Sequence, residues 1–285
     1  MSSSFLSIIV THHKTFALLK LCLKNIKKYC NNLSYEIILT NSESSAYNSL
    51  FIKENYPEIK LVDFKENVGY SKLVNAGIKQ ANGNFILIVN ADIIVCENSI
   101  KKLLQFMENY PRIGLVGPQL LNFNGKPQNS CFKFYTPFTI LYRRTFLGKL
   151  PWAKKVINNF LMRGELARFN PDDKIPYIEV DWLMGSALMT NRSALTKVGL
   201  LDEKFFMYFE DVDWAKRFWE KGYKVAYFPG ALMCHYHQKM SSKKGGLLDI
   251  FINKYSRIHV KSALRYFWKH GIKNLSAERA DKKLK

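Results

Sequence analysis

The sequence predicts an α/β fold built on a mostly parallel, doubly wound sheet. Short β-branched runs alternate with segments of helical periodicity over residues 5–110, which is typical of βαβ units. Right-handed crossovers between such units place helices on both faces of the sheet. Thr11, Asn41 and Asp92 each follow a strand-like run. Because ligands of such sheets bind beyond the carboxyl ends of the strands, we expect these side chains to meet in one crevice.

The elements of this first part can be assigned in chain order from apolar periodicity and end signals. A turn at Asn82-Gly83 and the proline at Pro111 end the last two helical segments. Strands are expected at residues 5–10, 35–39, 59–63 and 84–89. Helices are expected at residues 16–29, 44–56, 70–81 and 99–110.

The pattern changes after residue 121. Residues 122–178 contain Gly125 and prolines at positions 127, 137, 151, 171 and 176, set among aromatic and basic residues, which predicts a long, partly mobile excursion. Regular elements then resume, with a strand at 180–190, helices at 193–198 and 211–221, and a strand at 224–228. The segment 247–270 reads as an amphipathic helix.

Length and composition favour a globular protein with one large core. The chain has 285 residues, of which 47% are hydrophobic, enough for one large domain or two small ones. Apolar runs stay well short of a membrane span, and the N-terminus enters its first strand without a signal-peptide pattern. The five cysteines are scattered and lack CxxC spacing, which favours reduced thiols and a cytoplasmic location.

The net charge of +20 is unevenly distributed along the chain. Residues 239–285 hold 13 Lys or Arg against 3 acids, and residues 142–163 hold six Lys or Arg and no acid. Basic segments interleaved with aromatic residues suit an anionic membrane surface or nucleic acid, and a simple solvated surface is the third interpretation. A nucleic-acid-binding protein would place this charge along a groove with stacking aromatics, whereas much of it lies in the tail.

Three polar clusters stand out against their apolar surroundings. Asn90-Ala-Asp92 interrupts a buried-strand pattern, and a carboxylate there is costly unless a metal ion, a cation or a ligand pairs with it. Acids at 210, 211 and 213 follow an aromatic run, and histidines stand at 235 and 237. A hard cation such as Mg²⁺ or Mn²⁺ takes few protein ligands and keeps positions for phosphate oxygens, so Asp92 with one imidazole would suit it.

Taken in order, these motifs resemble the inverting glycosyltransferases of family 2, which have the nucleotide-sugar fold called GT-A. The resemblance covers most of residues 5–240. The Asn-Ala-Asp and Val-Asp-Trp-Leu variants resemble most the bacterial rhamnosyltransferase branch. The motifs that carry it are residues 7–11, 66–77, 81–92, 180–187, 199–206, 208–213 and 229–235.

The resemblance implies roles for individual residues on the donor side. Asp92, the last acid of the family's DxD motif, would bind the cation that bridges the diphosphate, with His235 as the second metal ligand. Asn90 replaces the first acid of that motif. Asn41 replaces an Asp that accepts a hydrogen bond from the pyrimidine base, and its amide oxygen can still accept one. The residues implied in donor binding are Thr11, Asn41, Asn67, Gly69, Asn75, Asn90 and Asp92.

The resemblance also implies the catalytic and acceptor residues. Asp211 of the Glu210-Asp211 pair would be the base that deprotonates the acceptor hydroxyl during in-line attack. Segment 182–186 would line the acceptor and donor-sugar side, through Trp182, Gly185 and Ser186.

Together these features predict a metal-dependent inverting glycosyltransferase that uses Mg²⁺ or Mn²⁺. It would move a sugar, rhamnose in the branch it resembles, from a nucleoside diphosphate sugar to a glycan hydroxyl in cell-surface polysaccharide synthesis. A lipid-linked acceptor is expected. The replacements at Asn41 and Asn90 leave an inactive sugar-nucleotide-binding relative as the alternative, with a nucleic-acid-binding protein as a third.

The expected organisation is a GT-A domain over residues 1–240 and a basic amphipathic tail over 241–285. The excursion at 122–178 would face the acceptor. We expect the tail to hold the enzyme on the inner, cytoplasmic face of an anionic membrane. Packing on the domain and a homodimer contact are the alternatives for its apolar face, which is formed by Phe251, Tyr255, Ile258, Leu264, Phe267 and Trp268.

Overall fold

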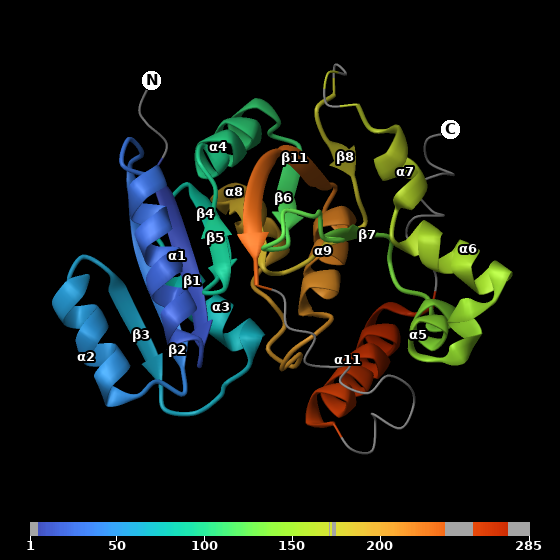
Figure 1. Ribbon diagram of the computed structural model, residues 1–285, viewed down its shortest axis with the longest axis horizontal. Helices are drawn as coiled ribbons and strands as arrows, with labels where there is room; N and C mark the ends of the chain where they lie inside the picture. The colour runs from blue at the N-terminus through green and yellow to red at the C-terminus, as the bar shows by residue number, and fades with distance from the viewer. Residues whose placement is uncertain (1–4, 171, 173–174, 237–252, 273–285) are drawn as a thin grey trace.

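A computed structural model describes residues 5–170, 172, 175–236 and 253–272. Its centre is a twisted sheet with the strand order β3-β2-β1-β4-β10-β6-β11-β5, and β8 pairs with β11 at its side (Figure 1). The strands are β1 (Leu6–His13), β2 (Tyr35–Ser42), β3 (Lys60–Phe64), β4 (Phe85–Asn90), β5 (Ile93–Val95), β6 (Ile113–Leu121), β8 (Ile178–Glu179), β10 (Ala187–Asn191) and β11 (Lys224–His235).

The sheet combines parallel and antiparallel pairs. Strands β3, β2, β1 and β4 are all parallel, and β6 is parallel to β11. Between these two groups β10 runs antiparallel to both β4 and β6, while β5 and β8 are antiparallel to β11. The predicted α/β class is confirmed, and the antiparallel strand in the middle of the sheet is an addition that the βαβ pattern did not indicate.

Helices cover both faces, as a doubly wound sheet requires. One hydrophobic cluster joins Ile8 and Leu87 of the sheet to α1 (Phe16–Tyr29), α2 (Ala46–Asn55) and α4 (Ser99–Asn109). The other joins Ile9 and Ile88 to α3 (Tyr70–Gln80), α8 (Arg192–Val198) and α9 (Glu210–Glu220). Alternate residues of β1 and β4 therefore face opposite layers, which follows from the two-residue period of a strand.

Two predicted strands differ from the observed ones. The run 180–190 is split into β9 (Trp182–Leu183), which pairs with β7 (Cys131–Phe132), and β10, which joins the main sheet. Gly185 and Ser186 lie in the turn between β9 and β10, at the edge of the sheet that is formed by the ends of the strands. Strand β11 runs on past residue 228 with an irregularity between Phe228 and Leu232, where Pro229 has no N–H to donate.

The expectation of an irregular excursion at 122–178 is wrong for its middle part. The structure has α5 (Pro137–Arg144), the 3-10 helix η1 (Phe146–Lys149), α6 (Pro151–Phe160) and α7 (Arg163–Arg168) there. Two prolines that suggested a loop stand in the first turn of α5 and α6. Proline is favoured at that position because its missing N–H has no partner within a helix anyway.

The amphipathic helix near the C-terminus is α11 (Lys254–His270), and it packs on the same core as α9. Ala263 and Tyr266 are buried in that core, and Ser262 Oγ donates to the Met207 carbonyl over 2.9 Å. Leu264 and Trp268 remain exposed, whereas Phe251 lies outside the described residues. Of the interpretations of the apolar face, packing on the domain thus holds for part of it. No helix in the described ranges is long and apolar enough to cross a membrane.

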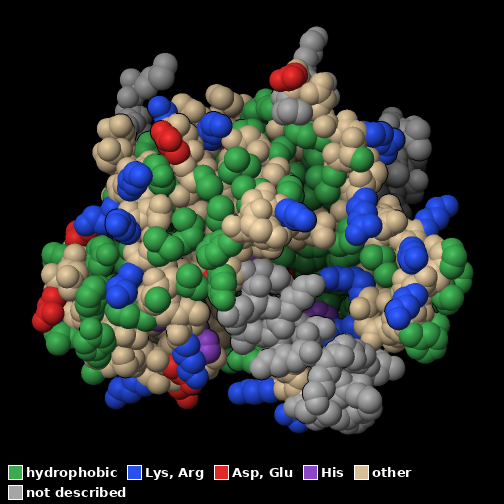
Figure 2. All heavy atoms as spheres, in the orientation of Figure 1, with side chains coloured by type: hydrophobic (Ala, Val, Ile, Leu, Met, Phe, Trp, Pro, Cys, Tyr) green, Lys and Arg blue, Asp and Glu red, His purple; other side chains and the backbone are tan. Residues whose placement is uncertain are grey.

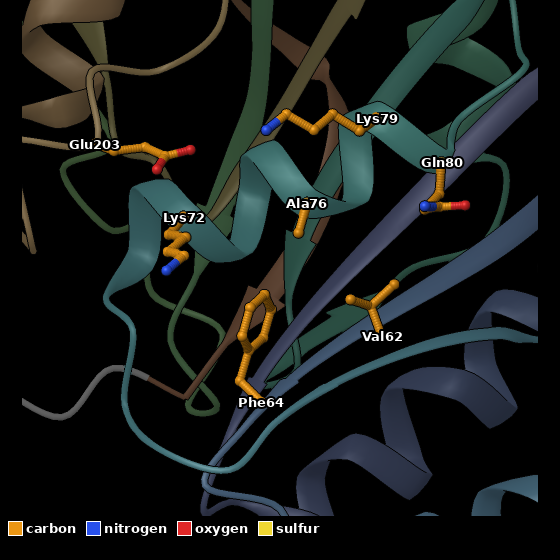
Figure 3. A pocket seen from close by; sticks show the side chains of 7 residues that line it. All are labelled: Val62, Phe64, Lys72, Ala76, Lys79, Gln80 and Glu203. Carbon is orange, nitrogen blue, oxygen red and sulfur yellow. The ribbon is translucent and has the colours of Figure 1, made fainter.

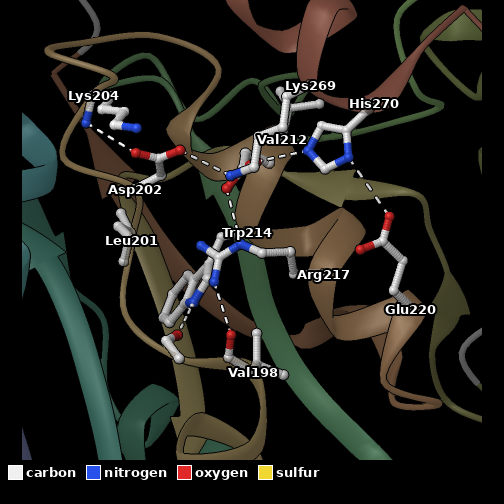
Figure 4. Close-up of polar contacts among 12 residues, drawn as sticks. Val198, Leu201, Asp202, Lys204, Val212, Trp214, Arg217, Glu220, Lys269 and His270 are labelled. Atoms are coloured by element: carbon white, nitrogen blue, oxygen red, sulfur yellow. Dashed lines mark hydrogen bonds and ion pairs between the residues drawn. The ribbon is translucent and has the colours of Figure 1, made fainter.

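A buried ion cluster around Asp213 joins α11 to α9 (Figure 4). One carboxylate oxygen lies 2.7 Å from Lys269 Nζ and 2.7 Å from His270 Nε2, and the other accepts a hydrogen bond from Arg217 Nε over 2.9 Å. Burial alone would raise the pKa of Asp213. The hydrogen bond from His270 and the charges of Arg217 and Lys269 outweigh burial and lower the pKa to about 2.

We predict that Asp213→Asn lowers the free energy of unfolding by about 2–4 kcal/mol, because it leaves buried cations without their counter-charge. Since the folded-state pKa lies below the unfolded one, the stabilisation exists above pH 4 and disappears between about pH 4 and 2. Urea unfolding at pH 7 measures the loss. The exposed pair Lys27–Glu58 gives the control, since Glu58→Gln should cost less than about 1 kcal/mol. Equal effects of the two variants would contradict the importance of this cluster.

Candidate active site

A cleft of about 1390 Å³ opens at the carboxyl ends of β1 and β4. Its walls come from the start of α3, the turn before β10, the N-terminus of α9, the end of β11 and the helices α5 and η1. Eleven residues that the sequence analysis singled out line it: Thr11, Asn67, Gly69, Asn90, Asp92, Trp182, Gly185, Ser186, Glu210, Asp211 and His235.

Asn90, at the end of β4, forms hydrogen bonds to β1 and to the turn before β10 at the floor of the cleft. Its side-chain Oδ1 accepts a hydrogen bond from Thr11 Oγ1 over 2.9 Å, and its backbone N–H donates to the Ser186 carbonyl over 2.9 Å. The side-chain contact fixes the end of β4 to the end of β1, and the backbone contact fixes it to the turn before β10. The side chain of Asn90 therefore positions the strand ends and adds no charge.

Asp92 is a partly buried residue whose Oδ1 atom is withdrawn from water and lacks a hydrogen-bond donor. Among the described residues Oδ1 has no hydrogen-bond partner, and His235 Nε2 lies 3.7 Å from it. Burial raises the pKa of Asp92 to about 6. Such an oxygen, withdrawn from water beside an imidazole nitrogen, is a position that a cation would satisfy.

Gln128 holds His235 in one tautomer. Its Nε2 donates to the His235 carbonyl over 3.0 Å and to Asn122 Oδ1 over 2.9 Å, so its Oε1 accepts from His235 Nδ1 over 3.0 Å. His235 Nδ1 then carries the proton, and Nε2 on the Asp92 side is the nitrogen that can bind a metal. The sequence analysis missed Gln128, because nothing in its local pattern distinguishes it from a solvated polar residue.

The donor set fits a divalent cation that takes its remaining ligands from substrate and water. No group of three or more His, Cys, Asp and Glu side chains within the described ranges is arranged to hold a metal. A closed structural site is thus not formed by these residues. One carboxylate and one imidazole match instead the sparse protein ligation of Mg²⁺ or Mn²⁺ in phosphate-binding sites. His237, the other candidate near this position, lies outside the described residues.

Asp211 and Glu210 begin α9 directly after two residues in left-handed conformations, Tyr208 and Phe209 with φ of 68° and 67°. Asp211 accepts hydrogen bonds from the N–H groups of Gly185 over 3.1 Å and Val212 over 2.9 Å. Burial raises its pKa to about 6, even though these N–H groups favour the charged form. Strained backbone of this kind is common at functional sites.

Glu210 has a different environment from its neighbour. Its side chain is buried, and one oxygen, Oε2, has no hydrogen-bond partner among the described residues. Burial and the charge of Asp211 hold the pKa of Glu210 well above its usual range. Of the two neighbouring acids, Glu210 is therefore the one whose charged form is disfavoured by burial and by the charge of its neighbour.

The Asn67–Gly69 turn and Tyr70 shape the adjoining wall. Gly69 has a φ of 83°, and a Cβ there would lie 2.5 Å from the Phe206 carbonyl oxygen, so only glycine fits. Asn67 Oδ1 accepts from the Gly69 N–H over 3.0 Å. Tyr70 donates its hydroxyl to the Gly185 carbonyl, whose residue also contacts Asp211. Tyr70 is a further cleft residue that the sequence analysis did not single out.

Asn75 and Asn41 were expected to contact the donor, and the structure places both elsewhere. The amide of Asn75 donates to the Leu201 carbonyl and to Glu203, and it accepts from the Leu201 N–H, so it joins α3 to the segment before α9. Asn41 is fully buried, and its Oδ1 lies 2.7 Å from His12 Nδ1. Neither residue lines the cleft. The Asn41 amide oxygen thus has a partner on the protein and lies outside the cleft lining, while its predicted contact with the base stays a prediction.

Trp182 belongs both to the core and to the cleft wall. Its ring stacks on Phe132 with centroids 4.4 Å apart, and its Nε1 donates to the Lys133 carbonyl over 2.8 Å. Only 6% of the residue is exposed. Its packing energy therefore comes mainly from the aromatic cluster below the cleft.

A second, smaller pocket of about 230 Å³ lies between α3 and β3 (Figure 3). Val62 and Phe64 form its base, and Lys72, Lys79 and Glu203 stand around it. It contains none of the predicted catalytic, donor-binding, acceptor or metal-binding residues. The chemistry predicted from the sequence is thus gathered in the larger cleft.

Comparison with known proteins gives an independent view of the chain. Residues 7–162 match the family described as glycosyl transferase family 2. N-acetylglucosaminyl-diphospho-decaprenol L-rhamnosyltransferase of Mycobacterium tuberculosis is 29% identical over 197 residues, 64% of this chain and 60% of that protein. Rhamnosyltransferase WbbL of Escherichia coli is 24% identical over 257 residues, which are 85% of this chain and 87% of that protein. The chain thus spans about 60% of the length of the mycobacterial relative.

Solved structures show the same fold at low identity. GalNAc-T7, solved with UDP, GalNAc and Mn²⁺, has a TM-score of 0.61 at 15% identity, covering 83% of this chain and 44% of that one. The mannosyltransferase PcManGT of Pyrobaculum calidifontis, solved with GDP-Man and Mn²⁺, has a TM-score of 0.54 at 16% identity, covering 84% of this chain and 59% of that one. The predicted GT-A fold is confirmed by these neighbours.

We predict that Asp92→Asn raises the free energy of unfolding by about 1–2 kcal/mol at pH 8 in EDTA, because it removes a buried charge with an unpaired oxygen. Urea unfolding without metal measures the gain. The exposed Asp63 provides the control, since Asp63→Asn should change stability by less than about 0.5 kcal/mol. A destabilised Asp92→Asn protein would show that the carboxylate serves the fold rather than a ligand.

Proposed function

Since the chain belongs to glycosyl transferase family 2, we propose that it is a metal-dependent inverting glycosyltransferase. It transfers a sugar, rhamnose by analogy with its relatives, from a nucleoside diphosphate sugar to a hydroxyl of a lipid-linked glycan. The observation that carries this proposal is the arrangement of the cleft. The Asp92–His235 pair and Asp211, whose pKa is about 6, line one cavity at the carboxyl edge of the sheet.

On the donor side, Asp92 Oδ1 and His235 Nε2 would hold Mg²⁺ or Mn²⁺ with the diphosphate oxygens. The cation supplies positive charge to the leaving nucleoside diphosphate. Gln128 Oε1 accepts a hydrogen bond from His235 Nδ1, so in the neutral ring Nε2 is the nitrogen that would bind the cation. Thr11 and Asn90 fix the strand ends that carry this pair, so the cation site depends on the geometry of β1 and β4.

On the acceptor side, Asp211 is the group suited to remove the hydroxyl proton. With a pKa of about 6 its carboxylate is largely ionised at neutral pH yet basic enough to accept a proton. The Gly185 N–H donates to Oδ2 and orients the carboxylate. Attack by the deprotonated hydroxyl opposite the leaving diphosphate inverts the anomeric carbon. Burial and the charge of Asp211 raise the pKa of Glu210, which disfavours a second negative charge beside Asp211.

The relatives suggest a lipid-linked acceptor, and the outer wall of the cleft has the matching charge. Arg143, Arg144 and Lys149 of α5 and η1 line this wall. Arg143 Nη1 donates to the Tyr135 hydroxyl over 2.9 Å, which holds the guanidinium beside the cleft. An acceptor whose sugar is joined to lipid through a diphosphate would place that diphosphate against these cations.

The same helices present an apolar and basic outer surface that suits the membrane carrying such an acceptor. Phe138, Phe146 and Trp152 are 62%, 78% and 52% exposed. Figure 2 shows hydrophobic side chains interspersed with Lys and Arg over α5 and α6, at the right of the view. Leu264 and Trp268 of α11 add exposed apolar groups. We therefore extend the proposed membrane contact from the C-terminal tail to α5, η1 and α6.

We predict that Asp211→Asn retains donor binding and lowers turnover by about 10²- to 10⁴-fold, the usual effect of losing a general base. Wild-type kcat should fall about tenfold per pH unit below 6, because protonation removes the base. Transfer from dTDP-rhamnose to a synthetic lipid-diphosphate N-acetylglucosamine with Mn²⁺ measures both. Glu210→Gln is the matched control, since it keeps the side-chain size and leaves Asp211 in place, and it should preserve most of the rate. An inactive Glu210→Gln beside a nearly normal Asp211→Asn would reverse the assignment of the base.

If the wild-type protein binds the donor but transfers no sugar, the inactive-relative alternative replaces the proposal.

We predict that the full chain co-sediments with phosphatidylglycerol vesicles and is released by salt, since each Lys or Arg near such a surface contributes about 1 kcal/mol. The double variant Phe146→Ser/Trp152→Ser should bind at least about fivefold more weakly, because it removes the apolar contacts. Tyr47→Ser/Leu50→Ser, which removes two exposed residues of α2, is the control and should bind normally. Binding equal to wild type by the first variant would exclude α5, η1 and α6 as the contact.

A further inference from the structure

We infer that His12 recognises the base of the sugar nucleotide through Nε2, and that Asn41 is the positioning residue that makes Nε2 an acceptor. The ligand would be a nucleoside diphosphate whose base carries a ring imide N–H. This inference rests on the proposed function and deepens it by naming the class of base.

His12 lies at the right edge of the sheet for such a role. It stands near the carboxyl end of β1, directly opposite Asn41 of β2 in the strand register. The residue is only 2% exposed, and it lines the cleft next to Thr11. Asn41 itself is withdrawn behind it. The position that the family resemblance assigns to base recognition is therefore reached from the cleft through His12.

Hydrogen bonds fix which nitrogen of His12 carries the proton. Ser44 Oγ donates to the Ser45 carbonyl over 3.2 Å, so it accepts from Asn41 Nδ2, 2.5 Å away. Asn41 Oδ1 then faces His12 Nδ1 at 2.7 Å and can only accept. Nδ1 carries the hydrogen, and burial lowers the pKa of His12, which keeps the ring neutral.

Nε2 is consequently a buried lone pair. It has no hydrogen-bond partner among the described residues. It points away from Asn41, because the two ring nitrogens diverge. Buried acceptors without a donor are rare in folded proteins and are commonly explained by a ligand or a bound water. A ligand that donates at this position would satisfy the group, and one that accepts would leave two lone pairs facing each other.

The chemistry separates the bases into two groups. Uracil and thymine carry N3–H, and guanine carries N1–H, so each can donate to Nε2. The corresponding ring nitrogens of cytosine and adenine are acceptors. The edge of the His12 ring lies against Phe16, with centroids 6.4 Å apart, which keeps bulk water from one side of the imidazole. A polar site of this kind rejects analogues that lack the donor more strongly than an apolar pocket would.

The neighbouring His13 offers a built-in comparison. It also lines the cleft, but its Nε2 contacts Glu43 at 2.5 Å and lies 3.3 Å from Asn67 Nδ2. Its ring nitrogen therefore already has partners on the protein. His12 can therefore select the base through an unpartnered Nε2, whereas His13 cannot.

The test is isothermal titration calorimetry of the full chain with nucleoside diphosphates and Mn²⁺. UDP, dTDP or GDP should bind about tenfold or more tightly than CDP and ADP, as loss of one buried hydrogen bond predicts. N3-methyl-UDP, which lacks the donor, should bind like CDP. This last comparison uses the wild-type protein and so does not depend on whether a variant folds.

Variants then assign the preference to the two residues. His12→Phe should abolish the preference for UDP over CDP, because the acceptor Nε2 is removed, and His13→Phe should preserve the ratio. Asn41→Leu should reduce the ratio, because the tautomer is no longer fixed. Asn41→Asp still accepts a hydrogen bond from His12 Nδ1, so it should keep the UDP/CDP ratio that Asn41→Leu loses. A purely structural Asn41 would not make the ratio depend on this hydrogen bond.

Two kinds of failure are distinguishable. Absence of binding by every nucleotide would overturn the proposed function and this inference with it. Equal binding of UDP, N3-methyl-UDP and CDP, or a UDP/CDP ratio unchanged in His12→Phe, would overturn the role of His12 alone.

Discussion

Burial of carboxyl groups at one edge of the central sheet is the constraint on which the rest of the site depends. Asp92, Glu210 and Asp211 all have raised pKa values because the cleft withdraws them from water. Nothing in a stable fold requires this, since a buried carboxyl group costs free energy unless it is paired. The strands, the Asn90 hydrogen bonds and the turn at Gly185 hold these groups where a cation and a sugar acceptor can use them.

Helix α9 shows how neighbouring acids acquire opposite properties. Among the residues that the structure describes, Asp211 accepts its hydrogen bonds from backbone N–H groups, and burial raises its pKa to about 6. Asp213, two residues later, faces Arg217, Lys269 and His270 and has a pKa of about 2. The first arrangement leaves a base, whereas the second attaches α11 to the domain. The C-terminal helix therefore contributes to the placement of α9, and through it to the placement of Asp211.

Two side-chain amides act on two histidines in the same way. Asn41 Oδ1 accepts a hydrogen bond from His12 Nδ1, and Gln128 Oε1 accepts one from His235 Nδ1. Each amide is oriented by its own further hydrogen bonds, to Ser44 in one case and to Asn122 in the other. In each histidine the unprotonated nitrogen is Nε2. The two imidazoles thus present lone pairs at different positions along the same cleft, one beside Asp92 and one beside the end of β2.

The sequence by itself determined the α/β class, the main strands and helices of the first 110 residues and eleven of the residues that line the cleft. It could do so because apolar periodicity is local and because Thr11 and Asp92 follow directly after their strands. Asp211 and His235 were assigned through the family motifs that contain them. The tertiary structure alone decided which side chains have free polar atoms. Asn41 and Asn75 have the right residue type but bond to His12 and to Leu201. Gln128 reaches the site from a segment with no local signal, and His12 follows the predicted Thr11 without a pattern of its own. Hydrogen bonds between residues far apart in the chain fix these outcomes, and no local pattern encodes them. The same holds for α11, whose apolar face suggested a membrane contact until its packing against α9 accounted for part of it.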